Sequence, residues 1–189
     1  ARQSEKAVQT LLQIHKDYDL DMVEKNGSFK DLKKILVPVK LSESCIELCK
    51  YAIALAKKTK AELKLLYVYE DPTLNAPVRY TASWEKHVRL ELEDANKKAQ
   101  LKLVNFSLEL KNKIPADLFN SVKLHYRMLK GTPENVIADA SERYHPDAII
   151  MGTKEKLKPG EFLEKTTVRV IEHSNYPVLV VPFYATFKG

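Results

Sequence analysis

Short apolar runs alternate along most of this chain with longer stretches in which apolar residues recur every three or four positions. The short runs predict strands over residues 34–39, 61–69, 121–129, 148–151 and 177–182. The longer stretches predict helices over residues 44–60, 84–111, 133–145 and 160–174. Strands that alternate with helices predict an open parallel sheet with helices on both faces, because each strand–helix–strand unit forms a right-handed crossover.

Particular residues mark the ends of several of these elements. Ser44 and Glu47 have the spacing of a capping box, which predicts that a helix begins at Ser44. Thr132 and Pro133 predict the next helix start, since threonine caps helices and proline suits their first position. Residues 71–83 are rich in proline and turn-forming residues, which predicts a loop. Gly152 is expected to permit a tight turn, or the close approach of a ligand, after the strand at 148–151.

A further amphipathic helix is predicted over residues 3–25, ahead of the first strand. The chain is therefore divided into an N-terminal helix with its linker, residues 1–31, and an α/β domain, residues 32–189. Two interpretations of the helix stand side by side. It lies on the domain or on a second copy of the chain, or it connects the domain to an upstream region embedded in a membrane.

Composition limits the classes of function. The 189 residues suit one domain with an extension, and 44% of them are apolar, which is enough for a core. The net charge of +6 comes from 31 basic residues interspersed with 25 acidic ones, a pattern typical of a solvated surface, so no nucleic-acid partner is expected.

Cys45 and Cys49 lack the further ligands of a zinc site and are interpreted as core residues in a reducing, cytoplasmic setting. No apolar run is long enough for membrane insertion, and no signal peptide is visible.

The strand at 148–151 and the helix that follows it indicate where a ligand would bind. In an open α/β sheet, ligands lie at the carboxyl ends of the strands, where backbone N–H groups and helix dipoles converge. The expected ligand-binding residues are Pro38, Val39, Lys40, Val68, Met151, Gly152, Thr153, Lys154, Lys165, Thr166 and Thr167.

Four segments resemble the universal stress protein family: KKILVPV, AELKLLYVYE, GTPENVIADASERYHPDAIIMGT and YPVLVVP, in family order between Leu32 and Pro182. Each segment is a weak signal alone, and together they are fairly specific. The resemblance implies a flavodoxin-like or Rossmann-like sandwich with five parallel strands. It also implies a homodimer, often formed by antiparallel pairing of the last strands, which are residues Val178, Leu179, Val180 and Val181 here.

Many members of that family bind ATP through a glycine, two residues, a second glycine, nine residues, and a third glycine followed by serine or threonine. Gly152 matches the first glycine and Thr166 keeps the hydroxyl position, but Glu155 and Lys165 replace the other two glycines. The family's aspartate after the first strand is Lys40. Three of the positions that define the nucleotide-binding branch are therefore changed.

These changes have opposite effects on the binding of an anion. Glu155 would bring a like charge to a phosphate, at a cost on the order of 1 to 4 kcal/mol at about 4 Å. Lys40, Lys154, Lys156 and Lys165 would attract a phosphate as point charges, or they lie on a solvated loop. We expect no bound cofactor, with ATP or another adenine nucleotide as the alternative.

The pattern favours a non-catalytic regulatory module that dimerises and docks to a partner, in one version as the cytoplasmic domain of a membrane transporter. No Ser/His/Asp, Cys/His or paired-carboxylate arrangement of catalytic spacing is visible in the chain. The alternative is a stress sensor that binds a nucleotide, with weak or no ATPase activity.

Overall fold

The computed structural model describes residues 32–73, 81–153 and 164–182. Their elements are, in chain order, β1 (Lys34–Val39), α3 (Glu43–Thr59), β2 (Glu62–Tyr69), α4 (Ala82–Lys113), α5 (Ala116–Phe119), β3 (Leu124–Lys130), α6 (Pro133–Tyr144), β4 (Ala148–Thr153), α7 (Lys165–His173) and β5 (Val178–Pro182). The helix predicted over residues 3–25 lies outside the described residues.

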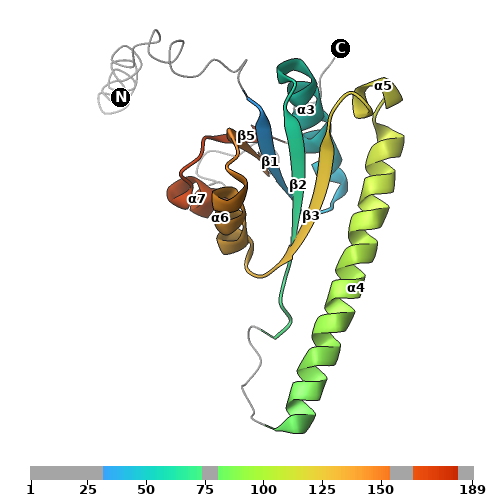
Figure 1. Ribbon diagram of the computed structural model, residues 1–189, viewed down its shortest axis with the longest axis vertical. Coiled ribbons are helices and arrows are strands. Elements are labelled where there is room, and N and C mark those ends of the chain that lie inside the picture. Colours follow the sequence, from blue (N-terminus) through green and yellow to red (C-terminus); the bar gives the residue numbers. More distant parts are fainter. Residues whose placement is uncertain (1–31, 74–80, 154–163, 183–189) are drawn as a thin grey trace, which may run out of the picture. The chain divides into compact units, whose positions relative to one another are not determined.

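The five strands form one parallel sheet in the order β3-β2-β1-β4-β5 (Figure 1). The predicted α/β fold is confirmed. The chain moves outward from β1 through β2 to β3, and then returns to the other side of β1 to form β4. This reversal separates the loops that leave β1 and β4, and it therefore places a crevice at their carboxyl ends.

Two layers of helices cover the sheet, α3 and α4 on one face and α6 and α7 on the other (Figure 1). Ile35 and Val37 of β1 pack in the first layer, and Leu36 between them packs in the second. β1 is thus buried on both faces, which explains why it is a continuous apolar run rather than an alternating one. Cys45 and Cys49 are free and buried in the first layer, and their prediction as core residues is confirmed.

The predicted start of α3 at Ser44 is wrong. The N-cap is Ser42, which makes no side-chain capping bond, and its hydroxyl lies 2.9 Å from that of Ser44. Glu47 does not reach back to the helix start, because it forms an ion pair with Lys50 at 2.7 Å. The capping-box spacing was present, but the serine two residues earlier took the N-cap position.

Other boundaries also differ from the predictions. β4 continues through Gly152 to Thr153, and Gly152 pairs with Val181 of β5, so this glycine lies in a strand and not in a tight turn. β3 begins at Leu124 and not at residue 121, and the short helix α5, which the periodicity did not reveal, precedes it. α7 begins at Lys165, with Glu164 as its N-cap, and not at residue 160.

Candidate functional site

A cavity of about 80 Å³ lies at the carboxyl ends of β1, β2 and β4, beside the start of α7. Eight of the predicted ligand-binding residues line it: Pro38, Val39, Lys40, Val68, Met151, Gly152, Thr166 and Thr167. They meet there because parallel strands end at the same edge of a sheet, and because α7 returns to that edge after β4. The sequence therefore predicted most of the walls of the cavity.

Two other predicted residues, Lys165 and Thr153, do not line the cavity. Lys165 is the first residue of α7 and is exposed. Thr153 is buried at the end of β4, and its hydroxyl has no hydrogen-bond partner within the described structure. Lys154 lies outside the described residues, as does Glu155.

The interior of the cavity is mainly apolar. Besides the predicted residues, it is lined by Cys45, Leu48, Leu66, Pro133, Ile137 and Glu164. Most of these come from core positions of α3, β2 and α6, which the sequence marked only as apolar. A cavity of this kind suits a small apolar group, since it offers few polar atoms to fix the orientation of a charged ligand.

The charged groups at the cavity are Lys40 and Glu164, and they form an ion pair with each other. Lys40 follows β1 and its side chain is 67% exposed, whereas the Glu164 side chain is 23% exposed. Glu164 is the N-cap of α7, where the helix dipole favours a negative charge. The Glu164 side chain makes no capping hydrogen bond to α7, but its carboxylate brings a negative charge to the helix start, where an anionic ligand would otherwise be favoured.

Sequence reasoning missed Glu164 because it placed the start of the last helix several residues too early. An acidic residue in the interior of a helix carries no special meaning, whereas one at the N-cap lies at the positive end of the dipole. The local sequence contained no clear signal for this N-cap, because glutamate is not among the residues that N-caps prefer.

The site offers little means for catalysis. Cys45 lines the cavity, where its sulfur accepts hydrogen bonds from the Lys40 backbone N–H and the Ser42 hydroxyl, both at 3.4 Å. Burial raises the pKa of the Cys49 thiol far above its usual range, and Cys45 raises it further, so Cys49 stays protonated and unreactive. Within the described residues, no group of three or more His, Cys, Asp or Glu side chains could hold a metal ion.

The family model for the universal stress protein family matches residues 31–182, which is most of the chain. The chain therefore belongs to the universal stress protein family. It is 33% identical over 168 residues to Universal stress protein MJ0531 of Methanocaldococcus jannaschii, an alignment that covers 88% of this chain and 91% of that protein.

Solved structures agree with this assignment. The alignment with the structure of the protein MJ0577 covers 80% of this chain and 96% of the MJ0577 chain, with 29% identity and a TM-score of 0.57. The alignment with the universal stress protein UspA from Lactobacillus plantarum covers 79% of this chain and 97% of the UspA chain, with 22% identity and a TM-score of 0.58. This similarity shows a shared fold.

Some universal stress proteins bind adenine nucleotides. Two of the more distant matches are a universal stress protein in complex with cAMP and one from Archaeoglobus fulgidus in complex with dAMP, at TM-scores of 0.48 and 0.42. These ligands are properties of those proteins, and similarity of this degree carries no argument about the cavity described above.

None of the helices in the described ranges is both long enough and apolar enough to cross a membrane.

Proposed function

We propose that this chain is a non-catalytic universal stress protein module that dimerises and docks to a partner protein, and that it does not bind ATP in the manner of the nucleotide-binding branch. In this proposal the α/β fold is kept as a scaffold, while the phosphate site of the family is occupied by the chain's own side chains.

One observation carries the proposal: the ion pair between Lys40 and Glu164 at the start of α7. Lys40 lies at the position where the nucleotide-binding pattern has an aspartate, and Glu164 directly precedes Lys165, which replaces the third glycine of that pattern. A phosphate placed at this helix terminus would meet the Glu164 carboxylate, and a like-charge contact at about 4 Å costs on the order of 1 to 4 kcal/mol. The cavity supports the same conclusion, because its volume of about 80 Å³ is below the roughly 300–1,000 Å³ of typical small-molecule pockets.

Isothermal titration calorimetry with ATP and Mg²⁺ tests the proposal. The unmodified protein, at tens of micromolar, is expected to give no binding heat. Glu164→Gln removes the charge with little change of shape. The affinity of this variant for ATP is expected to exceed that of the unmodified protein by a factor of about 5 or more, which would appear as weak binding heat. Glu172→Gln is the matched control, since it removes an exposed carboxylate from the same helix.

Two results would count against this account in different ways. A submicromolar dissociation constant for the unmodified protein would contradict the proposal itself. If Glu164→Gln gave no more heat than Glu172→Gln, the carboxylate would not be what excludes the nucleotide, and the role given to the ion pair would be wrong.

The second candidate function is a nucleotide sensor. It is favoured by the hydroxyl-bearing Thr166 and Thr167, which line the cavity together with Gly152. A ligand that binds only the folded state stabilises it by about 2.7 kcal/mol when the ligand concentration is 100 times the dissociation constant. Millimolar ATP should then raise the unfolding midpoint by several degrees in a thermal scan, and an unchanged midpoint would reject the sensor.

The cytoplasmic setting and the link to a membrane transporter belong to the same proposal. The free cysteines Cys45 and Cys49 support a reducing compartment, because cysteines in an oxidising compartment are usually paired in disulfides. Fractionation of cells with an antibody against the chain would separate the alternatives. Recovery in the soluble fraction after carbonate treatment would argue against a covalent link to a membrane region.

A further inference from the structure

A second cavity, which we call the basic groove, lies between α6 and the face of β2 and β3 that α6 leaves uncovered. Its volume is about 580 Å³. The charged side chains that line it are Glu62, Lys64, Lys123, His125, Arg127 and Arg143. It is distinct from the cavity at the carboxyl ends of the strands, with which it shares only the buried Leu66.

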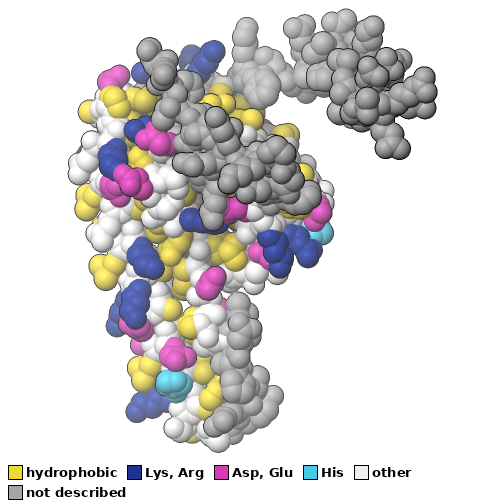
Figure 2. Space-filling model, turned by 180° about the vertical axis from the view of Figure 1, so that it is seen from behind, with side chains coloured by type: hydrophobic (Ala, Val, Ile, Leu, Met, Phe, Trp, Pro, Cys, Tyr) yellow, Lys and Arg dark blue, Asp and Glu magenta, His cyan; other side chains and the backbone are white. Residues whose placement is uncertain are grey.

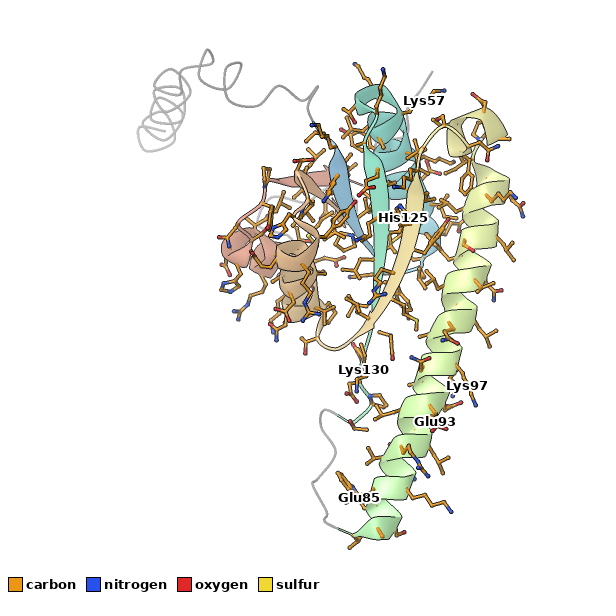
Figure 3. All side chains as sticks on the ribbon, in the orientation of Figure 1. Lys57, Glu85, Glu93, Lys97, His125 and Lys130 are labelled. Carbon is orange, nitrogen blue, oxygen red and sulfur yellow. The ribbon has the colours of Figure 1, made fainter. Side chains whose placement is uncertain are left out.

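The alternation of the strands gathers these charges on one face. Side chains two residues apart in a strand point to the same side, so Lys123, His125 and Arg127 form one row. Lys64 of β2 lies opposite His125 in the parallel register. Figure 3 marks His125 on β3, with Lys130 at the carboxyl end of the same strand.

Positive charge exceeds negative charge in the basic groove. Glu62 accepts a hydrogen bond from the Tyr144 hydroxyl at 3.0 Å and pairs with Lys123 at 3.3 Å. Within the described ranges, no carboxylate forms an ion pair with Lys64, Arg127 or Arg143. The groove therefore holds three cations that an acidic ligand could neutralise.

The surroundings of Lys64 show the effect of this excess. Its ammonium group lies 3.5 Å from the centre of the Tyr144 ring. Burial lowers the pKa of Lys64, Glu62 opposes that change, and the positive charges of Lys34 and Arg127 lower the pKa further. A negative charge brought into the groove would relieve this repulsion.

The position of β3 at the edge of the sheet favours a ligand with an extended backbone. β3 is the last strand of the sheet and pairs only with β2 among the described strands. Charged residues on such an edge can serve as a guard against aggregation. Protection against aggregation, however, needs only projecting charges. The basic groove is also lined by the apolar residues Leu66, Leu129 and Ala140, which can receive the side chains of a ligand.

We propose that the basic groove is a docking site for an extended acidic segment of a partner protein, which lies along β3 as an added strand. A strand repeats its side chains on one face every 6.6 to 6.8 Å or so, and acidic residues at alternate positions would match the row formed by Lys123, His125 and Arg127. The inference rests on the proposed docking function and names the chemistry of the partner.

The test uses the full chain and fluorescence anisotropy with a labelled eight-residue peptide in which glutamate alternates with threonine. We expect saturable binding that weakens by about tenfold or more in the double variant Arg127→Gln/Arg143→Gln. The control is Lys97→Gln/Lys102→Gln on α4, which removes the same charge from exposed positions. Figure 3 marks Lys97 on this helix. Charges of both signs are interspersed along that helix (Figure 2), so the control should bind the peptide as the unmodified chain does.

Four outcomes would overturn the proposal. The first is the absence of binding, and the second is an equal loss in the α4 control, which would indicate nonspecific attraction. The third is equal affinity for a peptide of the same composition whose glutamates are contiguous, because the alternating match would then not matter. The fourth is tighter binding of inorganic pyrophosphate or single-stranded RNA to the same two arginines. None of these outcomes depends on the ATP titration, so the two proposals can fail separately.

Discussion

Asp71 follows β2, and its carboxylate connects the carboxyl ends of two neighbouring strands. One oxygen accepts hydrogen bonds from the backbone N–H and the hydroxyl of Thr73, at 2.9 and 2.6 Å. The other forms an ion pair at 2.7 Å with Lys130, the last residue of β3. The hydrogen bond from Lys130 and those from Thr73 lower the pKa of Asp71 from 3.8 to about 2.

This pKa predicts how stability depends on pH. A carboxylate whose pKa is lower in the folded state stabilises the protein above the pKa of the unfolded state, and the contribution is lost as pH falls through the folded pKa. For Asp71 the loss should occur between about pH 4 and pH 2. Urea unfolding from pH 5 to pH 2.5 should show a smaller fall in the free energy of unfolding for Asp71→Asn than for the unmodified protein.

Asp139→Asn is the control for this experiment, since Asp139 is an exposed carboxylate on α6. Its pH dependence should be parallel to that of the unmodified protein. Identical curves for Asp71→Asn and Asp139→Asn would show that the ion pair with Lys130 does not contribute in solution.

At the scale of elements, the turn between β3 and α6 depends on Gly131. Its φ is +139°, a backbone conformation that residues with a Cβ rarely adopt, and its N–H donates to the carbonyl oxygen of Tyr69 at 3.0 Å. A Cβ at this position would also lie 2.7 Å from Cγ2 of Val136. Both effects penalise any side chain at the entry to α6.

Gly131→Ala should therefore lower the free energy of unfolding by on the order of 1–3 kcal/mol, as measured by urea denaturation. Asn135→Ala changes an exposed position in the first turn of the same helix and should cost much less. Equal stability of Gly131→Ala and the unmodified protein would mean that this turn adopts another conformation in solution.

The edge strand β5 is the element on which the proposed dimer depends. Val178, Leu179 and Val180 are half-buried and Val181 is buried, and β5 pairs only with β4 among the described strands. An apolar strand with unpaired backbone groups on one side favours pairing with a second copy.

Sedimentation velocity tests that dimer. Val180→Lys should shift the protein from dimer to monomer, because two lysines would meet across the paired edges. Leu101→Lys, on the exposed side of α4, should leave the dimer unchanged. A Val180→Lys dimer as stable as that of the unmodified chain would place the interface elsewhere.

The elements also show what the sequence could and could not reveal. The parallel sheet and its covering helices were predicted from apolar runs that alternate with helical stretches, whereas the order of the strands within the sheet was not predicted. The helix starts were less certain, because Ser42 and Ser44 are both good caps and only packing decides between them. The basic groove could not be predicted, since the pairing of β2 with β3 and the position of α6 bring Lys64, Arg127 and Arg143 together from distant parts of the chain.

At the scale of the whole molecule, the mixed charge distribution leads us to expect a protein partner rather than a nucleic acid. The net charge of +6 is spread over a surface of mixed sign, and the basic groove concentrates only a few cations beside an apolar floor. A nucleic-acid surface would need a longer basic path and would show steep salt dependence. Gel-shift experiments at low salt are therefore expected to show no retardation of duplex DNA, and a salt-sensitive shift would contradict this conclusion.

The central claim is that the site at the start of α7 is occupied by the chain's own ion pair and not by a nucleotide. The most direct measurement is the nucleotide content of protein purified without added nucleotide. The sample is denatured by heat, and the supernatant is examined by ultraviolet absorbance and ion-exchange chromatography. We predict no adenine absorbance above that of a buffer control. An adenine nucleotide released in proportion to the protein would contradict the account.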